Sequence, residues 1–356
     1  MTHTLPLPDF THERVEVTTG RRSGLFIAVA LHSSVLGSAL GGARLWTYPH
    51  WSDALGDALR LSAAMTLKNA AAGLDAGGGK SVIGLAPGES LDADRRRAAF
   101  LDLGDAVELM GGLYRTAEDV GSTTEDMLTV SEQTAHVVGL PQATGGSGEP
   151  AGPTSLGVYA SLRAVLERVA GSGDVAGRRI TVSGLGQVGG RLAQRLADEG
   201  ARLTVTDINP ARREFAASIG ATWAEPGTEH LLPADVFVPA GIGGILTDEV
   251  IDALDVAAVC GPANNPLADH SGAERLAGRG IVYAPDFVVN AGGVIYLDLE
   301  AKQIGTSEEI MARVAGIGDT VGRILDDAAE RGVTPLAAAE ELAASRLAAG
   351  ASVSAR

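Results

Sequence analysis

Lysine is scarce in this sequence, and two of its lysines lie close together. Of the 28 basic residues, 25 are arginines, and the lysines are Lys68, Lys80 and Lys302. Arginine stays protonated at any working pH, whereas a lysine amine can lose its proton when it is buried or lies near another cation. Lys68 and Lys80 are therefore candidates for acid–base chemistry. The alternative is chance placement, with Lys68 on a helix surface and Lys80 in a solvated loop.

Lys80 follows three glycines in the stretch LDAGGGKSVIG. Because glycine adopts turn conformations at little cost, we expect Gly77 to Gly79 to form a tight turn that brings Lys80 close to its target. SVIGLA then has the composition of a strand. Upstream, GLFIAVALH also indicates a buried strand, and we expect SSVLGSALGGARLW to be a turn-rich loop.

The segment before the glycines has helical periodicity from about residue 52 to residue 73. Lys68 shares one helix face with apolar residues at spacings of three, four and seven, namely Leu61, Ala64 and Met65. Such a face covers the lysine stem while its amine reaches outward. RRRAAFLDLGDAVELMGGLY is predicted to form a further helix of this region.

A second chemical motif, SGLGQVGG, has glycines at Gly184, Gly186 and Gly189. It follows the predicted strand RRITVSG, opens a predicted helix and precedes the strand ARLTVTD, so the context of a dinucleotide-binding βαβ unit is complete. The glycines permit the tight turn, the approach of a pyrophosphate and close helix–strand packing. Asp207, 18 residues after Gly189, suits the ribose hydroxyls and would repel a 2′-phosphate, which favours NAD over NADP. The alternative is a glycine-rich turn without a ligand.

The length of 356 residues suits two domains of ordinary size. The strands and helices of these domains must position the two motifs. The Gly/Pro/Ser/Thr-rich segment 139–155 looks like a boundary. After it, helices alternate with strands, including ADVFVPA, DVAAVCG and GIVYAPD, which predicts a doubly wound parallel sheet, and the chain from about residue 307 reads as a helical tail.

Composition narrows the function classes. A formal net charge of −16 argues against nucleic acid or an anionic membrane as partner. The single Cys260 excludes a disulfide within the chain and suggests a reducing compartment. No signal-peptide or membrane-spanning pattern is present, so we expect a soluble cytoplasmic protein. No metal is expected, because the histidines lack metal-ligand spacing (His32, His136, His230, His270).

The motifs together resemble the glutamate/leucine/phenylalanine/valine dehydrogenase superfamily, most closely its branched-chain members. The similar segments lie between about residue 24 and residue 300 and follow one another in the same order as in the family. They are ALGGARLW, MTLKNAAAGLDAGGGKSVIG, YRTAEDVGSTTEDM, GLGQVGGRLA, VTDIN, CGPANNPLAD and GIVYAPDFVVNAGGVI. The lysine block is long enough to be specific, whereas the glycine motif is shared with many dinucleotide-binding enzymes.

The resemblance implies NAD-dependent oxidative deamination of an L-amino acid to a 2-oxo acid and ammonia, and the reverse reaction. It implies Lys80 and Asp119 as catalytic residues and Lys68 as the group that binds the substrate carboxylate. The remaining implied substrate-site residues are Leu40, Gly41, Gly42, Ala117, Val294 and Asn265. The implied cofactor-site residues are Thr154, Gly184, Gly186, Gln187, Val188, Gly189, Asp207, Ala240 and Asn264, with the choice between Asn264 and Asn265 beside the nicotinamide left open.

Substrate preference rests on Ala117 and Val294, which by resemblance shape the side-chain pocket. Aromatic-specific members tend to have glycine at the first of these positions, so alanine and valine favour a branched aliphatic side chain. Ala43, Ala240 and Pro262 depart from the usual family residues. None of the three removes a catalytic group, but they leave the exact substrate open.

The expected architecture is a two-domain α/β enzyme. We expect a substrate and oligomerisation domain at 1–140, joined by the tail 328–356, and a Rossmann NAD domain at 141–327. The resemblance also implies a homo-oligomer formed through the first domain, and a cleft that closes over substrate. Three rivals remain: a phenylalanine dehydrogenase, a catalytically silent NAD-binding protein, and an unrelated redox enzyme that would use a histidine and an arginine.

Overall fold

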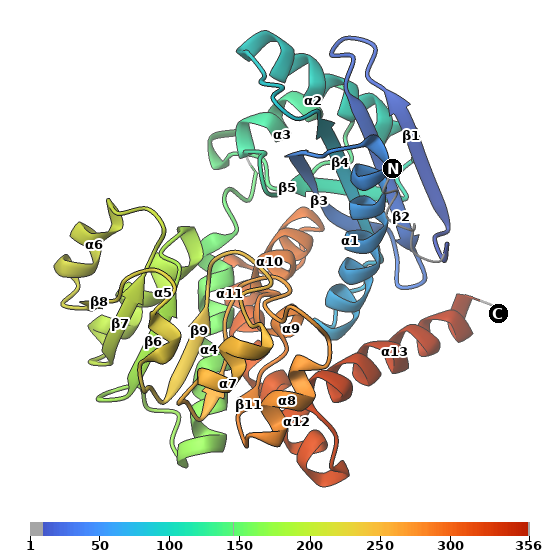
Figure 1. The fold of residues 1–356 in the computed structure, drawn as a ribbon. Coiled ribbons are helices and arrows are strands. Elements are labelled where there is room, and N and C mark those ends of the chain that lie inside the picture. The colour runs from blue at the N-terminus through green and yellow to red at the C-terminus, as the bar shows by residue number, and fades with distance from the viewer. Residues whose placement is uncertain (1–9, 145, 355–356) are drawn as a thin grey trace, which may run out of the picture. The chain divides into compact units, whose positions relative to one another are not determined.

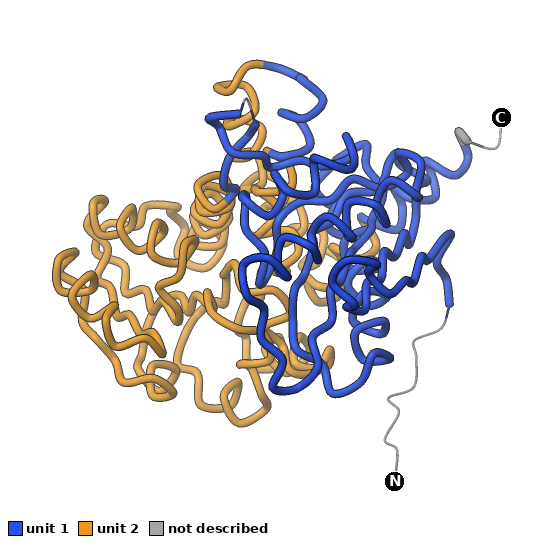
Figure 2. Tube along the Cα trace, turned by 90° about the horizontal axis from the view of Figure 1, so that it is seen from above, with its two compact units in different colours: residues 1–150, 297–305, 343–356 blue, residues 151–296, 306–342 orange. Residues whose placement is uncertain are grey.

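The computed structural model describes residues 10–144 and 146–354, which form two compact units (Figures 1 and 2). Unit 1 comprises residues 1–150, 297–305 and 343–356, and unit 2 comprises residues 151–296 and 306–342. The division differs from the sequence-based boundaries at 140 and 328. The Gly/Pro-rich segment belongs to unit 1 up to Pro150, with Gly139 next to Leu297, and residues 328–342 stay in unit 2.

Unit 1 is an α/β layer structure. Its elements are β1 (Arg14–Thr19), β2 (Phe26–Ser33), β3 (Ala39–Thr47), α1 (Trp51–Ala71), β4 (Gly78–Leu85), α2 (Ala93–Glu108), β5 (Tyr114–Glu118), α3 (Thr124–Ser131) and the 3₁₀ turn η1 (Gln142–Thr144). The sheet order is β1-β2-β4-β3-β5, with β3 parallel to both β4 and β5 and β2 antiparallel to β1 and β4.

The two faces of this sheet are covered by different helices. On one face, small residues of β2 and β4 pack with apolar residues of α1 (Ala28, Ala30, Val82, Ala54, Ala58, Leu59). On the other face, larger side chains pack with α2 (Ile27, Val29, Ile83, Phe100, Leu103, Tyr114). Since side chains alternate along a strand, Gly42 and Lys80 are on the α1 face and Gly41 and Gly79 on the α2 face.

Two sequence-based predictions for unit 1 are wrong. Residues 39–47 form strand β3, not a turn-rich loop, and Gly78 and Gly79 already belong to β4. The glycine triplet is not a tight turn, because two of its members are strand residues and none has the positive φ that would require glycine. Its glycines are needed for close packing: a Cβ at Gly78 would collide with the backbone of Thr66 on α1, and one at Gly79 with the ring of Tyr114.

Unit 2 is built on a six-stranded, all-parallel sheet of order β11-β10-β9-β6-β7-β8. Its elements up to the fourth strand are α4 (Ala151–Ala170), β6 (Arg179–Ser183), α5 (Gln187–Asp198), β7 (Arg202–Thr206), α6 (Arg212–Ser218), β8 (Thr222–Trp223), η2 (Glu229–Leu231) and β9 (Val236–Pro239). The next are α7 (Asp248–Ala253), β10 (Ala258–Val259), α8 (Gly272–Gly278), β11 (Val282–Tyr283) and α9 (Asp286–Val289). The predicted parallel, doubly wound sheet is confirmed.

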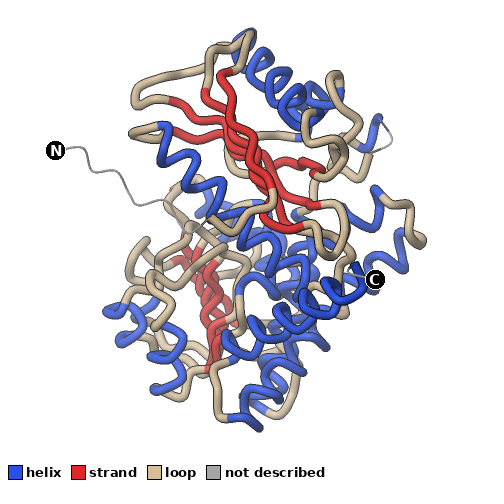
Figure 3. The backbone as a smooth tube through the Cα atoms, turned by 90° about the vertical axis from the view of Figure 1, so that its right-hand side faces the viewer, coloured by secondary structure: helices blue, strands red, loops and turns tan. Residues whose placement is uncertain are grey.

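The last helices are α10 (Gly292–Ala301), α11 (Ser307–Ala315), α12 (Ile317–Arg331) and α13 (Pro335–Ser354). The last three confirm the helical tail predicted from about residue 307. Figure 3 shows helices packed around the strands of each unit. Within the described residues, no helix is both long and apolar enough to cross a membrane.

Candidate active site

The centre of unit 1 is a buried ion pair between Lys80 and Asp119. Lys80 lies on β4 and is 4% exposed, and its Nζ lies 2.7 Å from Oδ2 of Asp119, the residue directly after β5. The strand register explains this meeting. Strands β4 and β5 lie on either side of β3, which carries Gly42. A Cβ at Gly42 would lie 2.6 Å from Cβ of Asp119. Glycine at this position therefore leaves room for the carboxylate.

The charges around this pair change the basicity of both groups. Burial lowers the pKa of the Lys80 amine below its usual value, and the positive charge of Arg44 acts in the same direction, while Asp119 opposes the shift. Burial by itself would raise the pKa of Asp119, but Lys80 and Arg44 outweigh it and lower this pKa. The site thus holds a carboxylate that stays ionised and an amine that is less basic than an exposed lysine.

A polar network supports the sheet beneath Lys80. The hydroxyl of Tyr114 donates to the Gly41 carbonyl at 3.0 Å, and the Ser81 hydroxyl lies 3.1 Å from both the Tyr114 and the Thr116 hydroxyls. Burial raises the pKa of Tyr114 to about 12, so it stays a neutral donor at physiological pH. These bonds tie β3, β4 and β5 together where the glycines bring them close.

The remaining unit 1 candidates lie on the strands next to this ion pair. They are Leu40, Gly41 and Gly42 on β3 and Ala117 on β5. Gly42 is paired with Ala117, and Leu40 with Gly78. Lys68 is half-buried on α1, two residues after Thr66, the residue whose backbone closely approaches Gly78. The part of α1 that carries Lys68 therefore lies against the start of β4.

In unit 2, the glycine motif forms the turn between β6 and α5. Gly184 has a φ of +114°, which favours glycine, and a Cβ at Gly189 would collide with the Gly184 carbonyl. A Cβ at Gly186 would meet nothing within 4 Å, so the N-terminus of α5, where Gln187 and Val188 form the first turn, is open. An open helix N-terminus with unpaired N–H groups suits a phosphate.

Asp207 follows β7 and braces this turn. Its Oδ2 accepts from the Leu185 amide at 2.7 Å, and its Oδ1 accepts from the Asn209 amide at 2.8 Å. A carboxylate has about four lone-pair sites, so further acceptor capacity remains. Ala240 follows β9 on the other side of the turn, since a Cβ at Gly184 would lie 2.7 Å from the Ala240 carbonyl carbon.

The other unit 2 candidates form two further groups. Asn264 and Asn265 follow β10 and are exposed. Asn290, which is 6% exposed, donates to the Asn264 side-chain oxygen at 2.9 Å. Thr154 on α4 packs beside the start of α10, because a Cβ at Gly292 would lie 3.0 Å from the Thr154 Cα. Val294, two residues after Gly292, is half-buried.

Comparison with known proteins assigns this arrangement to a family. Residues 11–136 match the model of the Glu/Leu/Phe/Val dehydrogenase dimerisation domain, and residues 205–353 match the Glutamate/Leucine/Phenylalanine/Valine dehydrogenase model. The chain belongs to the Glu/Leu/Phe/Val dehydrogenase family. The family resemblance and the two-domain α/β fold inferred from the sequence are thereby confirmed, and the chain is an oxidoreductase.

Two relatives and one solved structure show how far the similarity extends. A leucine dehydrogenase from Thermoactinomyces intermedius is 39% identical, with 95% of this chain and 91% of the relative covered. A valine dehydrogenase from Streptomyces albus is 39% identical, with 95% and 92% covered. The crystal structure of L-tryptophan dehydrogenase from Nostoc punctiforme has a TM-score of 0.80 at 35% identity, with 96% of this chain and 97% of that chain covered.

Three residues of this dehydrogenase that lie among the candidate groups do not stand out in the sequence motifs. Arg44 and Asp57 extend the Lys80–Asp119 pair, and buried Asn69 donates to the carbonyls of Leu40 at 3.3 Å and Gly77 at 2.6 Å. Asn69 thereby joins the end of α1 to both glycine segments. Its place next to Lys68 was a usable signal. Arg44 offered no such signal among 25 arginines.

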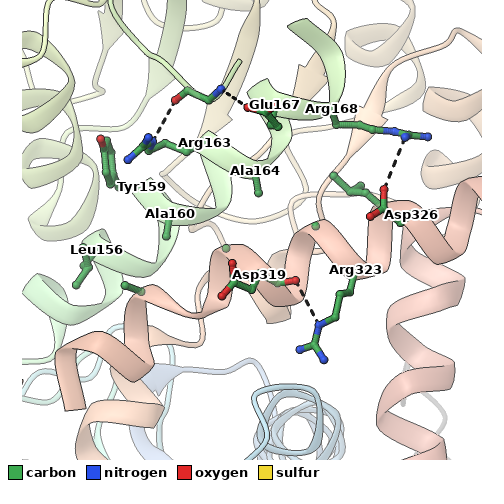
Figure 4. Close-up of a pocket in the computed structure, with 15 residues that line it drawn as sticks. Leu156, Tyr159, Ala160, Arg163, Ala164, Glu167, Arg168, Asp319, Arg323 and Asp326 are labelled. Atoms are coloured by element: carbon green, nitrogen blue, oxygen red, sulfur yellow. Dashed lines mark hydrogen bonds and ion pairs between the residues drawn. The ribbon is translucent and has the colours of Figure 1, made fainter. Parts of the chain in front are cut away.

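A pocket of about 870 Å³ in unit 2 lies apart from all of these residues, between α4 and α12 (Figure 4). Four of its charged groups already have partners: Arg163 donates to the Gly173 carbonyl at 3.1 Å, Glu167 accepts from the Gly173 amide at 2.7 Å, and Arg168 pairs with Asp326 at 3.7 Å. None of the predicted site residues lines it. Size alone does not make it the catalytic site of this dehydrogenase.

Proposed function

We propose that this enzyme catalyses NAD-dependent oxidative deamination of an L-amino acid with a branched aliphatic side chain, and the reverse reductive amination. The products of the forward reaction are the 2-oxo acid and ammonia. The observation that carries the proposal is the buried Lys80 amine 2.7 Å from Asp119 in a member of this dehydrogenase family. Its lowered pKa suits a group that must accept a proton.

The proposed chemistry follows from these two groups. NAD supplies the hydride acceptor for the substrate Cα when it is bound. Lys68 binds the substrate carboxylate. The neutral Lys80 amine takes a proton from the water that attacks the substrate iminium carbon, and the resulting ammonium hydrogen-bonds the new hydroxyl oxygen. Asp119 balances the positive charge and passes protons onward.

The glycine turn supports a dinucleotide cofactor. The open backbone at Gly186 suits the pyrophosphate, and Asp207 suits the adenosine ribose hydroxyls, which favours NAD over NADP. Ile208 and Ile242, which follow β7 and β9, are 88% and 77% exposed, and such apolar side chains suit an adenine ring. In this proposal Gln187, Val188 and Ala240 contact the cofactor, and Thr154 and Asn264 or Asn265 lie beside the nicotinamide.

The choice of substrate rests on Ala117 and Val294, the two residues that the family resemblance assigns to the substrate side chain. In this proposal, their side chains narrow the pocket against an aromatic ring. One methyl group discriminates by only about 1–3 kcal/mol, so phenylalanine is the leading alternative substrate. An aromatic substrate is also supported by the similar structure that is an L-tryptophan dehydrogenase.

The oligomeric state and the location belong to the same proposal. The match of residues 11–136 to a dimerisation domain supports a homo-oligomer, and a single buried cysteine is compatible with a cytoplasmic protein. Light scattering on the purified protein tests the oligomeric state, and a mass above that of one chain is expected.

The deciding experiment is NADH formation followed by absorbance across L-amino acids, with NADP and lactate-type acids in parallel. Leucine, valine and isoleucine with NAD should give the highest kcat/KM. Activity on no amino acid would refute the proposed function and favour a silent NAD-binding protein or another redox enzyme. A strong preference for phenylalanine would refute the substrate assignment only.

A further inference from the structure

The Asp119 carboxylate is held by two cations at the same oxygen. Its Oδ2 lies 2.7 Å from Lys80 Nζ and 3.1 Å from Nε of Arg44 on β3. Among the described residues, no hydrogen bond or ion pair to its Oδ1 is present, so this oxygen is left for other partners. Arg44 therefore shares the anchoring of Asp119 with the lysine that does the proposed chemistry.

Arg44 is itself fixed at its other end by Asp57 of α1. The Arg44 NH1 group lies 3.0 Å from Oδ2 of Asp57, which also accepts from the Tyr48 hydroxyl at 2.7 Å. Oδ1 of Asp57 accepts from Arg60 at 2.6 Å. Only 18% of the Arg44 side chain and 14% of the Asp57 side chain are exposed. The low exposure and the shared acceptors hold the guanidinium in one orientation.

The backbone explains why Arg44 reaches the site. Ala43 is paired with Glu118 across β3 and β5, so Arg44 comes opposite Asp119, the next residue. Gly42, two residues earlier on the same face, leaves the space between them open. No other arginine of the described chain pairs with Asp119.

We propose that Arg44 is a positioning residue for the reaction: its guanidinium fixes the Asp119 carboxylate against Lys80, and Asp57 fixes Arg44. This inference rests on the proposed function for its kinetic consequences. The charged groups that act on Lys80 are Asp119 after β5, Arg44 on β3 and Asp57 on α1. Glu118 is the adjacent carboxyl, and burial with repulsion from Glu149 raises its pKa to about 7.

The sign of the effect on Lys80 follows from the charges. A cation beside a lysine disfavours the protonated amine, so Arg44 lowers the pKa of Lys80. Without the guanidinium this pKa rises, and the amine becomes a free base only at higher pH. The acid limb of the pH profile of kcat/KM reflects protonation of Lys80, which makes the amine inactive as a base. This limb then moves to higher pH.

The test compares Arg44→Met and Arg44→Lys with the wild-type enzyme. Two readouts are taken: the pH profile of kcat/KM for the best amino acid, and the pH dependence of Lys80 acetylation by acetic anhydride, followed by mass spectrometry. Since the chain has only three lysines, Lys68 and Lys302 serve as internal references. Arg97→Met, which removes an exposed arginine paired with Glu132, is the matched control.

In Arg44→Met, both the acid limb and the acetylation midpoint of Lys80 should rise by about one pH unit, with a lower kcat. Arg44→Lys retains the charge, so its midpoint should stay near the wild-type value, and Arg97→Met should change neither readout. Equal midpoints in the wild type and Arg44→Met would overturn the inference, as would equal shifts in the Met and Lys variants. Arg44→Gln replaces Arg44→Met if the latter does not fold.

The two readouts separate this inference from the proposed function. A wild-type enzyme inactive on every amino acid refutes the proposed function, while the acetylation midpoints still test the link between Arg44 and Lys80. An active wild type whose midpoint is the same with and without the Arg44 charge refutes the Arg44 inference and leaves the proposed function standing.

Discussion

At the residue scale, the environment of Lys80 matters more than its residue type. Lys302, the third lysine, donates to the Asp75 carbonyl and to Asp298 at 2.8 Å each, which is a structural role. Lys80 has an acidic partner too, but it is buried next to a second cation. The same side chain therefore ties segments together at one position and suits proton transfer at the other.

Replacement of Lys80 tests the residue-scale argument. Lys80→Ala removes the proposed base and the partner of Asp119, so we expect kcat to fall by roughly 10²- to 10⁴-fold. NAD binding, measured by calorimetry, should be nearly unchanged because the glycine turn belongs to unit 2. Near-normal turnover would contradict the assignment. Circular dichroism shows whether the variant is folded.

At the element scale, the strands of the unit 1 sheet approach so closely that glycine is the only residue that fits at several positions. A Cβ at Gly41 of β3 would overlap the Gly79 carbonyl of β4, and one at Gly77, directly before β4, would overlap the carbonyl of Ser33 at the end of β2. The first of these contacts brings the strand that carries Arg44 next to the strand that carries Lys80. The glycines thus act through packing, and the site depends on the spacing of the strands.

Gly41→Ala is the corresponding test. The added methyl group meets backbone and not a flexible side chain, so we expect the free energy of unfolding to fall by about 1–3 kcal/mol or more. Urea unfolding followed by circular dichroism measures it. Gly322→Ala in α12 is the control: a Cβ there meets nothing within 4 Å, and alanine should stabilise the helix by up to about 1 kcal/mol. Equal stability of the two variants would contradict the packing argument.

At the scale of the whole molecule, a late segment of the chain completes unit 1. Residues 297–305 join this unit, where Asp298, 1% exposed, lies 2.5 Å from Arg115 and 2.8 Å from Lys302. Arg115 is on β5, the strand that leads to Asp119. The position of β5 therefore depends on a carboxylate about half the chain away.

Asp298→Ala should destabilise the protein strongly. Arg115 has only 14% of its side chain exposed, and removing one partner of a buried ion pair costs about 3–5 kcal/mol because the other charge stays desolvated. The measurement is the same urea titration. Asp327→Ala, which breaks an exposed pair with Arg331, should cost about 1 kcal/mol or less. Similar losses for the two variants would show that the Asp298 pair is not the anchor described.

The sequence by itself determined the features that depend on local patterns and composition. The strand–turn–helix pattern around Gly184 predicts a dinucleotide fold, and the alternation after residue 150 predicts the parallel sheet; both are short-range signals. The scarcity of lysine singles out Lys68 and Lys80 as candidates, and their roles stay predictions. The local pattern predicts a loop at residues 39–47, where the structure has strand β3, because glycine is a turn signal locally and its need in a tightly packed strand depends on distant neighbours.

Only the tertiary structure decided which charged groups meet. The four groups are Arg44 on β3, Lys80 on β4, Asp119 directly after β5, and Asp57 on α1. The register of β3 with β4 and β5 brings them together. The physical reason is that a parallel sheet aligns residues far apart in sequence, and burial there changes their basicity. The family and its chemistry were thus legible in the chain, whereas the positioning role proposed for Arg44 required the fold.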